Sequence, residues 1–299
     1  MIALLVGGVG YIGYHLAGEL ARQGHRVVVL SRPGSVARRR RLAGGLRDMG
    51  ARVVVGPVSG EMVARSGADA VYYLPGKPGG PRESVWEAHY GVLKRVLPGV
   101  EELGARLVYV SSIAVTADLL RAPPGSVAVE EERHLVGPGR PETFHSESKM
   151  EGERLTASYR GRWSIVRPGL VYGGRYGHFE WRLLRLACRF GLAPGSRWAP
   201  VVSVEGLARL LALAGEGRAD RLWINAVEPR SMLQALRRYC GARIGLELGW
   251  LVGVGRIAGR GSVLRLAWSI VGRKNLFRSR HPGLLGEAEL YSGEADEVG

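Results

Sequence analysis

The sequence predicts an α/β fold in which a doubly wound parallel sheet carries helices on both faces and is followed by a smaller C-terminal lobe. Short, continuous apolar runs recur through the first 170 residues, separated by stretches rich in helix formers. Such runs are typical of parallel strands buried on both faces. The first run ends in three glycines and opens into a helical segment, as a βαβ unit does. The alternation loosens after about residue 170, so we divide the chain into residues 1–170 and 171–299, with some later segments returning to the first core.

The individual elements follow from the same patterns. Apolar runs predict six strands, at residues 4–6, 26–30, 53–55, 70–74, 107–110 and 163–166. Helix-forming stretches predict helices at residues 14–23, 83–102, 147–159, 179–190, 205–214 and 231–240, with a short strand at 222–224. Pro98 predicts a break in the second helix, because proline removes a backbone hydrogen bond. The acidic end, residues 286–299, is expected to be a frayed tail.

Three glycines spaced three apart, Gly7, Gly10 and Gly13, connect the first strand to the first helix. Gly7 can turn the chain sharply, Gly10 lets the backbone approach a pyrophosphate, and Gly13 lets helix and strand pack closely. The new helix offers free N–H groups to an anion, and we assign Tyr11 and Ile12 to the same site. The segment predicts a dinucleotide site. Because its spacing differs from GxGxxG, an ordinary strand-to-helix turn is the alternative.

Composition excludes several classes of protein. The chain has 299 residues and no run of eighteen uncharged apolar residues, so no membrane-spanning helix is expected. The N-terminus has no basic leader and no cleavage site, and we expect a cytoplasmic protein. The net charge of +15 comes almost wholly from arginine and would attract phosphates. The basic residues are spread along the chain without a recognition motif, so nucleic acid is not an expected partner, and the compositional bias of a thermophilic source explains the charge better.

Cysteine usage predicts neither a disulfide framework nor a metal site. Cys188 and Cys240 are the only cysteines, and they lie far apart with no His or Cys ligand spacing nearby. We interpret them as two small buried hydrophobic residues, with a redox role as the alternative.

Five segments occur in an order that is informative when they are taken together: the glycine triplet and residues 108–115, 146–151, 166–173 and 200–208. In this order they resemble the extended short-chain dehydrogenases/reductases, a superfamily that includes NAD(P)-dependent epimerases and dehydratases. The resemblance covers residues 1 to about 240. It implies a Rossmann fold, a nicotinamide cofactor and a C-terminal lobe that binds a small-molecule substrate.

The resemblance also implies a serine, a tyrosine and a lysine beside the nicotinamide ring. The tyrosine exchanges a proton with the substrate, the serine binds the same oxygen, and the lysine binds the ribose and lowers the tyrosine pKa. Ser112 and Lys149 match the serine and lysine positions, and His145 stands where the tyrosine is expected. A neutral imidazole could relay protons at neutral pH, because Lys149 would lower its pKa. The alternative is that His145 only fills space in a protein that binds the cofactor without catalysis.

The expected cofactor is NADP in preference to NAD. No carboxylate follows the second strand, where one would accept from the ribose 2′-OH and repel a 2′-phosphate. Arg32, with Ser31 and Ser35 as hydroxyl donors, suits a 2′-phosphate, and the arginine run at residues 38–41 can equally be a solvated helix face. The other expected cofactor contacts lie at strand ends and on the later helix: Val58, Leu74, Pro75, Gly76, Ser111, Lys149, Pro168 and Gly169.

Two matters stay open at the level of sequence. The asparagine that the family carries on the helix after strand four is replaced by Ala88 or His89. Two apolar segments with interspersed Trp and Arg, residues 245–256 and 263–271, favour helices that close the substrate lobe or form a homodimer contact over a surface that docks on an anionic membrane.

The leading hypothesis is an NAD(P)-dependent oxidoreductase or epimerase that acts on a hydroxyl or carbonyl group of an unidentified small molecule, which could be phosphorylated. The competing hypothesis is a non-catalytic dinucleotide-binding sensor or assembly subunit.

Overall fold

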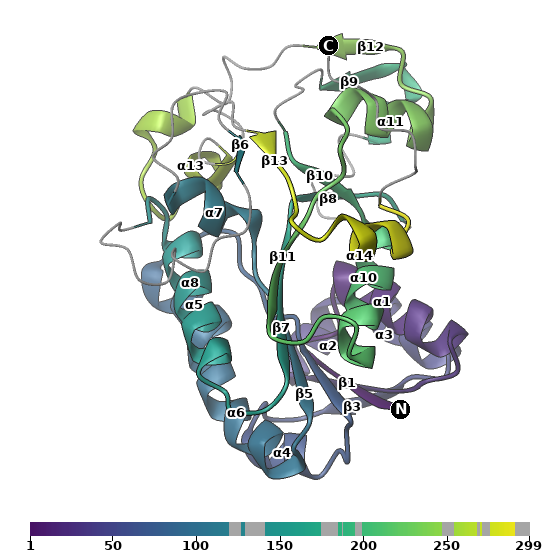
Figure 1. The fold of residues 1–299 in the computed structure, drawn as a ribbon, viewed down its shortest axis with the longest axis vertical. Coiled ribbons are helices and arrows are strands. Elements are labelled where there is room, and N and C mark those ends of the chain that lie inside the picture. The colour runs from purple at the N-terminus through teal and green to yellow at the C-terminus, as the bar shows by residue number, and fades with distance from the viewer. Residues whose placement is uncertain are drawn as a thin grey trace.

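The computed structural model describes residues 1–119, 127–128, 141–174, 185–186, 188–194, 199–246, 254–267, 270 and 276–290. Its centre is a parallel sheet of seven strands in the order β11-β7-β5-β4-β1-β2-β3 (Figure 1). The strands are β1 (Ile2–Val6), β2 (Arg26–Ser31), β3 (Arg52–Val55), β4 (Ala70–Tyr73), β5 (Arg106–Val110), β7 (Trp163–Pro168) and β11 (Leu222–Ala226). All six strands predicted from apolar runs are present. The order reverses between β1 and β4, which is where doubly wound folds bind ligands.

Both faces of the sheet are covered because successive side chains of a strand point to opposite sides. In β1, Ala3 and Leu5 join one buried cluster, whereas Leu4 and Val6 join another on the opposite face. The continuous apolar runs in the sequence are therefore strands buried on both sides.

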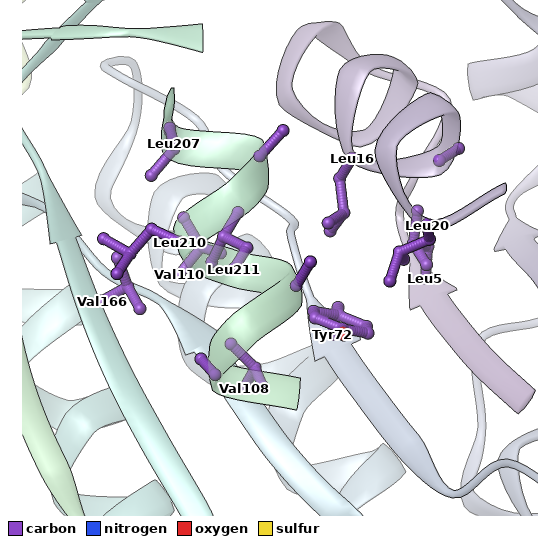
Figure 2. Packing of buried hydrophobic residues seen from close by; sticks show 14 of the residues in the cluster. Leu5, Leu16, Leu20, Tyr72, Val108, Val110, Val166, Leu207, Leu210 and Leu211 are labelled. Atoms are coloured by element: carbon purple, nitrogen blue, oxygen red, sulfur yellow. The ribbon is translucent and has the colours of Figure 1, made fainter. Parts of the chain in front are cut away.

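The helices α1 (Tyr11–Arg22) and α10 (Val204–Glu216) cover the same face. Figure 2 shows leucines of α10 lying near leucines of α1 above the sheet residues Tyr72, Val108 and Val166. The remaining α-helices are α2 (Pro33–Arg38), α3 (Arg40–Asp48), α4 (Gly60–Ala64), α5 (Arg82–Trp86), α6 (Val92–Leu103), α7 (Ile113–Leu119), α8 (Phe144–Ala157), α11 (Met232–Cys240), α13 (Val263–Ala267) and α14 (Pro282–Glu287).

The later part of the chain contributes to the main sheet and also forms small strand pairs. β11 extends the main sheet beside β7, and α14 packs near α10 (Figure 1). The small parallel pairs are β8 (Leu170–Tyr172) with β10 (Val201–Ser203), β9 (Leu192–Pro194) with β12 (Ile244–Leu246), and β6 (Val127–Ala128) with β13 (Leu276–Phe277).

The expected break at Pro98 is wrong, because α6 runs through Pro98 to Leu103. The buried side of α6 packs on the sheet, and this tertiary packing outweighs the loss of one backbone hydrogen bond. The irregularity lies earlier, where residues Glu87–Gly91 form a π-helix between α5 and α6.

The expectation of a frayed tail from residue 286 is wrong for its first residues. α14 continues to Glu287, and both Ala288 and Leu290 are fully buried. Leu290 packs against Gly206 of α10, so burial of apolar surface orders this segment despite its acidic neighbours. The rest of the expected tail lies outside the described residues.

The interpretation of the two cysteines as separate hydrophobic residues is also wrong. Cys188 and Cys240 form a disulfide, with their Cα atoms 6.0 Å apart and a sequence separation of 52 residues. The end of α11 lies beside the segment that contains Cys188, and sequence separation carries no information about such proximity. Of the helix expected at 179–190, only residues 185–186 and 188–190 are described.

The described part of the Trp/Arg-rich C-terminal segments packs partly on the core. Leu266 and Ile270 are buried with Ile113 and Ala114, next to the end of β5. This packing agrees with helices that close the C-terminal lobe.

Candidate active site

The glycine turn after β1 has the backbone geometry that a close-approach site needs. Gly7 has φ +72°, which favours glycine, and a Cβ there would lie 2.9 Å from the Pro75 ring. A Cβ on Gly13 would overlap the backbone of Gly8, so α1 packs tightly on the turn. At Gly10 the space is open, because the nearest atoms to a Cβ would be Arg39 Nη1 at 3.8 Å and the Gly7 carbonyl at 3.9 Å. The helix α1 starts at Tyr11, three residues earlier than predicted, so its free N–H groups lie beside this open space.

The end of β2 lies against the same turn. Ser31 is buried, and its Oγ accepts from the Val9 N–H at 3.4 Å. Arg32 is exposed before α2, and Ser35 lies within that short helix. Arg39, which sequence reasoning treated only as part of an arginine run, donates from Nη1 to the Val9 carbonyl at 2.8 Å. Burial and the neighbouring Arg38 lower the pKa of Arg39.

The first turn of α8 carries His145, which lies against the loop after β4. Thr143 caps the helix by accepting the Ser146 N–H. The His145 Nδ1 atom lies 3.1 Å from the Lys77 carbonyl oxygen. Burial and the Lys149 ammonium lower the pKa of His145 to about 4, and the hydrogen bond to Lys77 opposes this shift. The imidazole is therefore neutral at neutral pH.

Lys149 follows one turn later on α8 and is only 3% exposed. Its Nζ donates to the Val110 carbonyl at 2.7 Å and to the Pro75 carbonyl at 3.2 Å. Burial lowers the pKa of Lys149 to about 7, and the Glu153 carboxylate opposes this shift. The lysine thus ties the end of β5 to the loop after β4, at the carboxyl edge of the sheet.

Two serines follow β5 and differ in their surroundings. Ser112 is half-buried, and its Oγ accepts from the Ala114 N–H at 3.2 Å. Ser111, expected to contact the cofactor, instead donates its hydroxyl to Glu153. Because Ser112 lies two residues beyond Val110, whose carbonyl binds Lys149, the serine and the lysine share one edge of the sheet.

Beneath these residues lies an ion pair that sequence reasoning did not identify. Arg167 of β7 donates from Nε and Nη2 to the two carboxylate oxygens of Glu153, at 2.9 and 2.6 Å, and both side chains are fully buried. The pair links α8 to β7, next to Ser111. Its only sequence signal was an Arg and a Glu in segments predicted to be buried.

A second histidine also went unassigned in sequence reasoning. His89 lies in the π-helix and is fully buried. Its ring packs edge-on against the His145 ring, with centroids 4.9 Å apart. Of the two positions considered for the family's asparagine, His89 is therefore the one beside His145.

The other expected contacts lie at the ends of strands. Leu74 continues β4 by donating its N–H to the Val6 carbonyl, and Gly76 is exposed in the following loop. Val58 lies after β3 and packs against the core. Pro168 ends β7, and the Gly169 N–H donates to the Ala226 carbonyl of β11.

The C-terminal part of the chain forms a cavity of about 630 Å³. Tyr11 connects the glycine turn to this region by donating to the Gly173 carbonyl at 2.5 Å, and Tyr239 donates to the next carbonyl, Gly174, at 3.2 Å. The cavity is lined by Arg185, Leu186, Cys188, Arg189, Tyr239 and Cys240.

The described residues contain neither a membrane-spanning helix nor a metal-binding cluster. No helix there is long and apolar enough to cross a membrane. Within the same ranges, no group of three or more His, Cys, Asp or Glu residues is arranged to hold a metal ion.

A known protein with a similar sequence is a reductase. Divinyl chlorophyllide a 8-vinyl-reductase, chloroplastic, from Oryza sativa subsp. indica is 32% identical over 235 residues, which are 73% of this chain. The chain spans about half of that relative, 52% of its length.

Solved structures resemble the whole fold at low identity. The terminal R domain from the myxalamid PKS-NRPS biosynthetic pathway matches with a TM-score of 0.67 at 20% identity, covering 96% of this chain and 84% of that one. UDP-glucuronic acid 4-epimerase from Bacillus cereus, solved with NAD, matches with a TM-score of 0.67 at 15% identity, covering 99% and 94%. At these identities the likeness shows the fold alone.

A family model also matches the chain. It extends over residues 3–226 and so includes the glycine turn, the strand ends and the helix that carries His145 and Lys149. The chain belongs to the NAD dependent epimerase/dehydratase family.

Proposed function

We propose that the protein is an NADP-preferring oxidoreductase or epimerase that acts on a hydroxyl or carbonyl group of a small anionic molecule, with His145 in place of the usual tyrosine. The hydrogen bond between His145 Nδ1 and the Lys77 carbonyl supports this proposal most directly. A carbonyl oxygen only accepts, so the neutral imidazole carries its hydrogen on Nδ1. With the hydrogen on Nδ1, Nε2 carries a lone pair and is left to accept a proton.

His145 and Ser112 have different roles in the proposed reaction. When bound, the nicotinamide ring takes up or supplies a hydride. His145 Nε2 removes the proton of a substrate hydroxyl while the hydrogen on the same carbon leaves as hydride and the C=O bond forms. In the reverse direction the imidazolium returns its proton to the carbonyl oxygen. Ser112 Oγ already accepts from Ala114, so its hydroxyl hydrogen is left to donate to the substrate oxygen.

Lys149 has the position and the donors to bind the nicotinamide ribose. Two of its three ammonium hydrogens bind the Val110 and Pro75 carbonyls, and the third is left for a ribose hydroxyl. The open space beside Gly10, at the N-terminus of α1, has room for the pyrophosphate. Removing Lys149 should therefore weaken cofactor binding as well as turnover.

The preference for NADP is supported by the charge around the end of β2. No carboxylate is present there. Arg32 directly follows Ser31 at the end of β2, and Arg39 contacts the Val9 carbonyl in the glycine turn. A 2′-phosphate would offset the repulsion that lowers the pKa of Arg39.

An anionic substrate is supported by the cavity in the C-terminal part. Arg185 and Arg189 are four residues apart and both line it. Neither has an ion-pair partner among the described residues. A phosphate or carboxylate group of the substrate would pair with these two guanidinium groups.

The proposal is tested by a screen of hydroxyl compounds that follows nicotinamide absorbance, and then by substitution of His145. His145→Ala should lower kcat/KM by roughly 10²–10⁴-fold, the usual worth of a positioned acid or base. In the parent enzyme, turnover of an alcohol should fall as the pH drops through about 4, where the imidazole becomes protonated. His145→Tyr should keep or raise activity, because it restores the arrangement usual in the family.

The control is His25→Ala, which removes a histidine from the opposite edge of the sheet, before β2. It should leave kcat/KM unchanged. A His145→Ala enzyme as fast as its parent, with the same pH profile, would remove His145 from the mechanism.

A further inference from the structure

Two histidines from different elements bind the loop after β4. The Lys77 N–H donates to His89 Nε2 at 2.9 Å, and the Lys77 carbonyl lies 3.1 Å from His145 Nδ1. One residue of the loop therefore binds both imidazoles, one at each side of its backbone. The two rings meet edge-on with an interplanar angle of 85°.

These contacts determine which nitrogen of His89 carries hydrogen. Because Nε2 accepts the Lys77 N–H, a neutral His89 has its hydrogen on Nδ1. Nδ1 lies 2.7 Å from Ser148 Oγ, to which it donates. The Ser148 hydroxyl in turn donates to the carbonyls of Phe144 and His145, at 2.8 and 3.0 Å. The chain of hydrogen bonds thus runs from the loop, through His89, to the first turn of α8.

We infer that His89 is a positioning residue: by accepting the Lys77 N–H it keeps the Lys77 carbonyl aimed at His145 Nδ1, and so holds His145 in the tautomer whose Nε2 can accept a proton. The inference rests on the proposed role of His145. It adds a residue that acts on His145 through the backbone of Lys77.

The loop is also held at its near end, where Lys149 Nζ binds the Pro75 carbonyl, so the support from His89 falls on its middle, at Lys77. Residues 74–81 contain three glycines, one of which, Gly80, has φ +123°. Other contacts tie the loop at its far side, where the Gly80 N–H donates to Gly261 and Lys77 Nζ donates to Ser84. Only His89 binds the N–H of the peptide unit next to the carbonyl that His145 uses, among the described residues.

The charge state of His89 agrees with this role. Burial, the Lys149 ammonium and His145 all lower its pKa well below the ordinary value, so Nε2 stays an acceptor near neutral pH. A protonated His89 would have a hydrogen on Nε2 and would repel the Lys77 N–H.

The test uses two variants that each keep one half of the His89 contacts. In His89→Gln the side-chain oxygen can reach the position of Nε2 and accept the Lys77 N–H. In His89→Asn the shorter amide can reach Ser148 but not Lys77. The two variants have nearly the same polarity, so they compare the loss of the Lys77 contact with the loss of the Ser148 contact.

The readout is the tautomer of His145, measured by long-range proton–nitrogen correlation NMR on the whole chain labelled with ¹⁵N-histidine. The chain has seven histidines, and the His145 signals are assigned by their absence in His145→Ala. The parent and His89→Gln should show His145 protonated on Nδ1 only. His89→Asn should show both tautomers and a kcat/KM about tenfold lower, the effect of one hydrogen bond on a rate.

An unchanged His145 tautomer in a folded His89→Asn protein would overturn the inference. So would a parent protein whose His145 is protonated on Nε2, a result that requires no variant to fold. The variants distinguish the two proposals, because His145→Ala tests whether His145 is used, whereas the signals of His89→Asn test whether His89 controls the His145 tautomer. A parent His145 protonated on Nε2 would contradict both proposals.

Discussion

Val9, in the middle of the glycine turn, is held from both sides by side chains near β2. Its N–H binds Ser31 Oγ, and its carbonyl binds Arg39 Nη1. Arg39 is thereby held near the end of β2, where we propose that it contacts a 2′-phosphate. This contact complements Arg32, which is exposed at the start of α2.

We predict that calorimetry will show NADPH binding about tenfold or more tightly than NADH, because a charge-assisted contact is worth roughly 1.5–3 kcal/mol. Arg39→Gln should reduce the preference, and Arg32→Asp should reverse it by repelling the 2′-phosphate. Arg47→Gln, on the exposed side of α3, removes the same charge elsewhere and should change neither affinity. Equal affinities in the parent protein would contradict the assignment.

The contact between α8 and β7 depends on the ion pair of Glu153 and Arg167. The Glu153 carboxylate accepts hydrogen bonds from Nε and Nη2 of Arg167 and from the Ser111 hydroxyl. It therefore has hydrogen-bond partners although it is fully buried. Burying such a pair adds little net stability, but removing one partner leaves a charge in a dry interior. The helix that carries His145 and Lys149 is thereby tied to the sheet.

We predict that Glu153→Gln lowers the free energy of unfolding by roughly 3–5 kcal/mol, because the Arg167 guanidinium loses its counter-charge. Denaturant unfolding at neutral pH measures this difference. The control is Glu61→Gln, which breaks the exposed pair with Arg65 and should cost less than about 1 kcal/mol. Similar losses of unfolding free energy in the two variants would show that the buried pair contributes no more to stability than the exposed pair.

The whole molecule buries several titratable groups in their neutral forms, and its stability should therefore depend on pH. His145 has a pKa of about 4 in the folded protein against an ordinary 6.5, and that of His89 is also lowered. Between pH 4 and 6.5 the unfolded chain therefore binds more protons than the folded protein does. The stability from the neutral imidazoles is thus complete above pH 6.5 and is lost as the pH falls toward 4.

Lys149 extends the same trend to higher pH. Its pKa of about 7, against 10.5 when exposed, means that the unfolded chain binds more protons between these values, so stability rises with pH across that range. Buried tyrosines act oppositely, because their raised pKa values remove stability above pH 10, where unfolded phenols ionise: Tyr72, Tyr73 and Tyr109.

We predict that the free energy of unfolding rises from pH 4.5 to 6.5 by up to about 1.4 kcal/mol per pH unit for each buried histidine. Denaturant unfolding at a series of pH values measures the slope. His145→Phe should reduce the slope in this window, and Lys149→Met should flatten the rise above pH 7. A stability that stays constant or falls from pH 4.5 to 6.5 would contradict the burial of neutral imidazoles.

The sequence by itself determined the sheet, the glycine turn and the register of α8. Continuous apolar runs, a glycine triplet and the spacing of His145 and Lys149 are local patterns, and each depends on residues close together in the chain. Only the tertiary structure brought His89 and His145 to the same residue, Lys77, Arg39 to Val9, and Cys188 to Cys240. These partners lie on different elements, and their proximity follows from how helices pack on the sheet, which local periodicity does not encode.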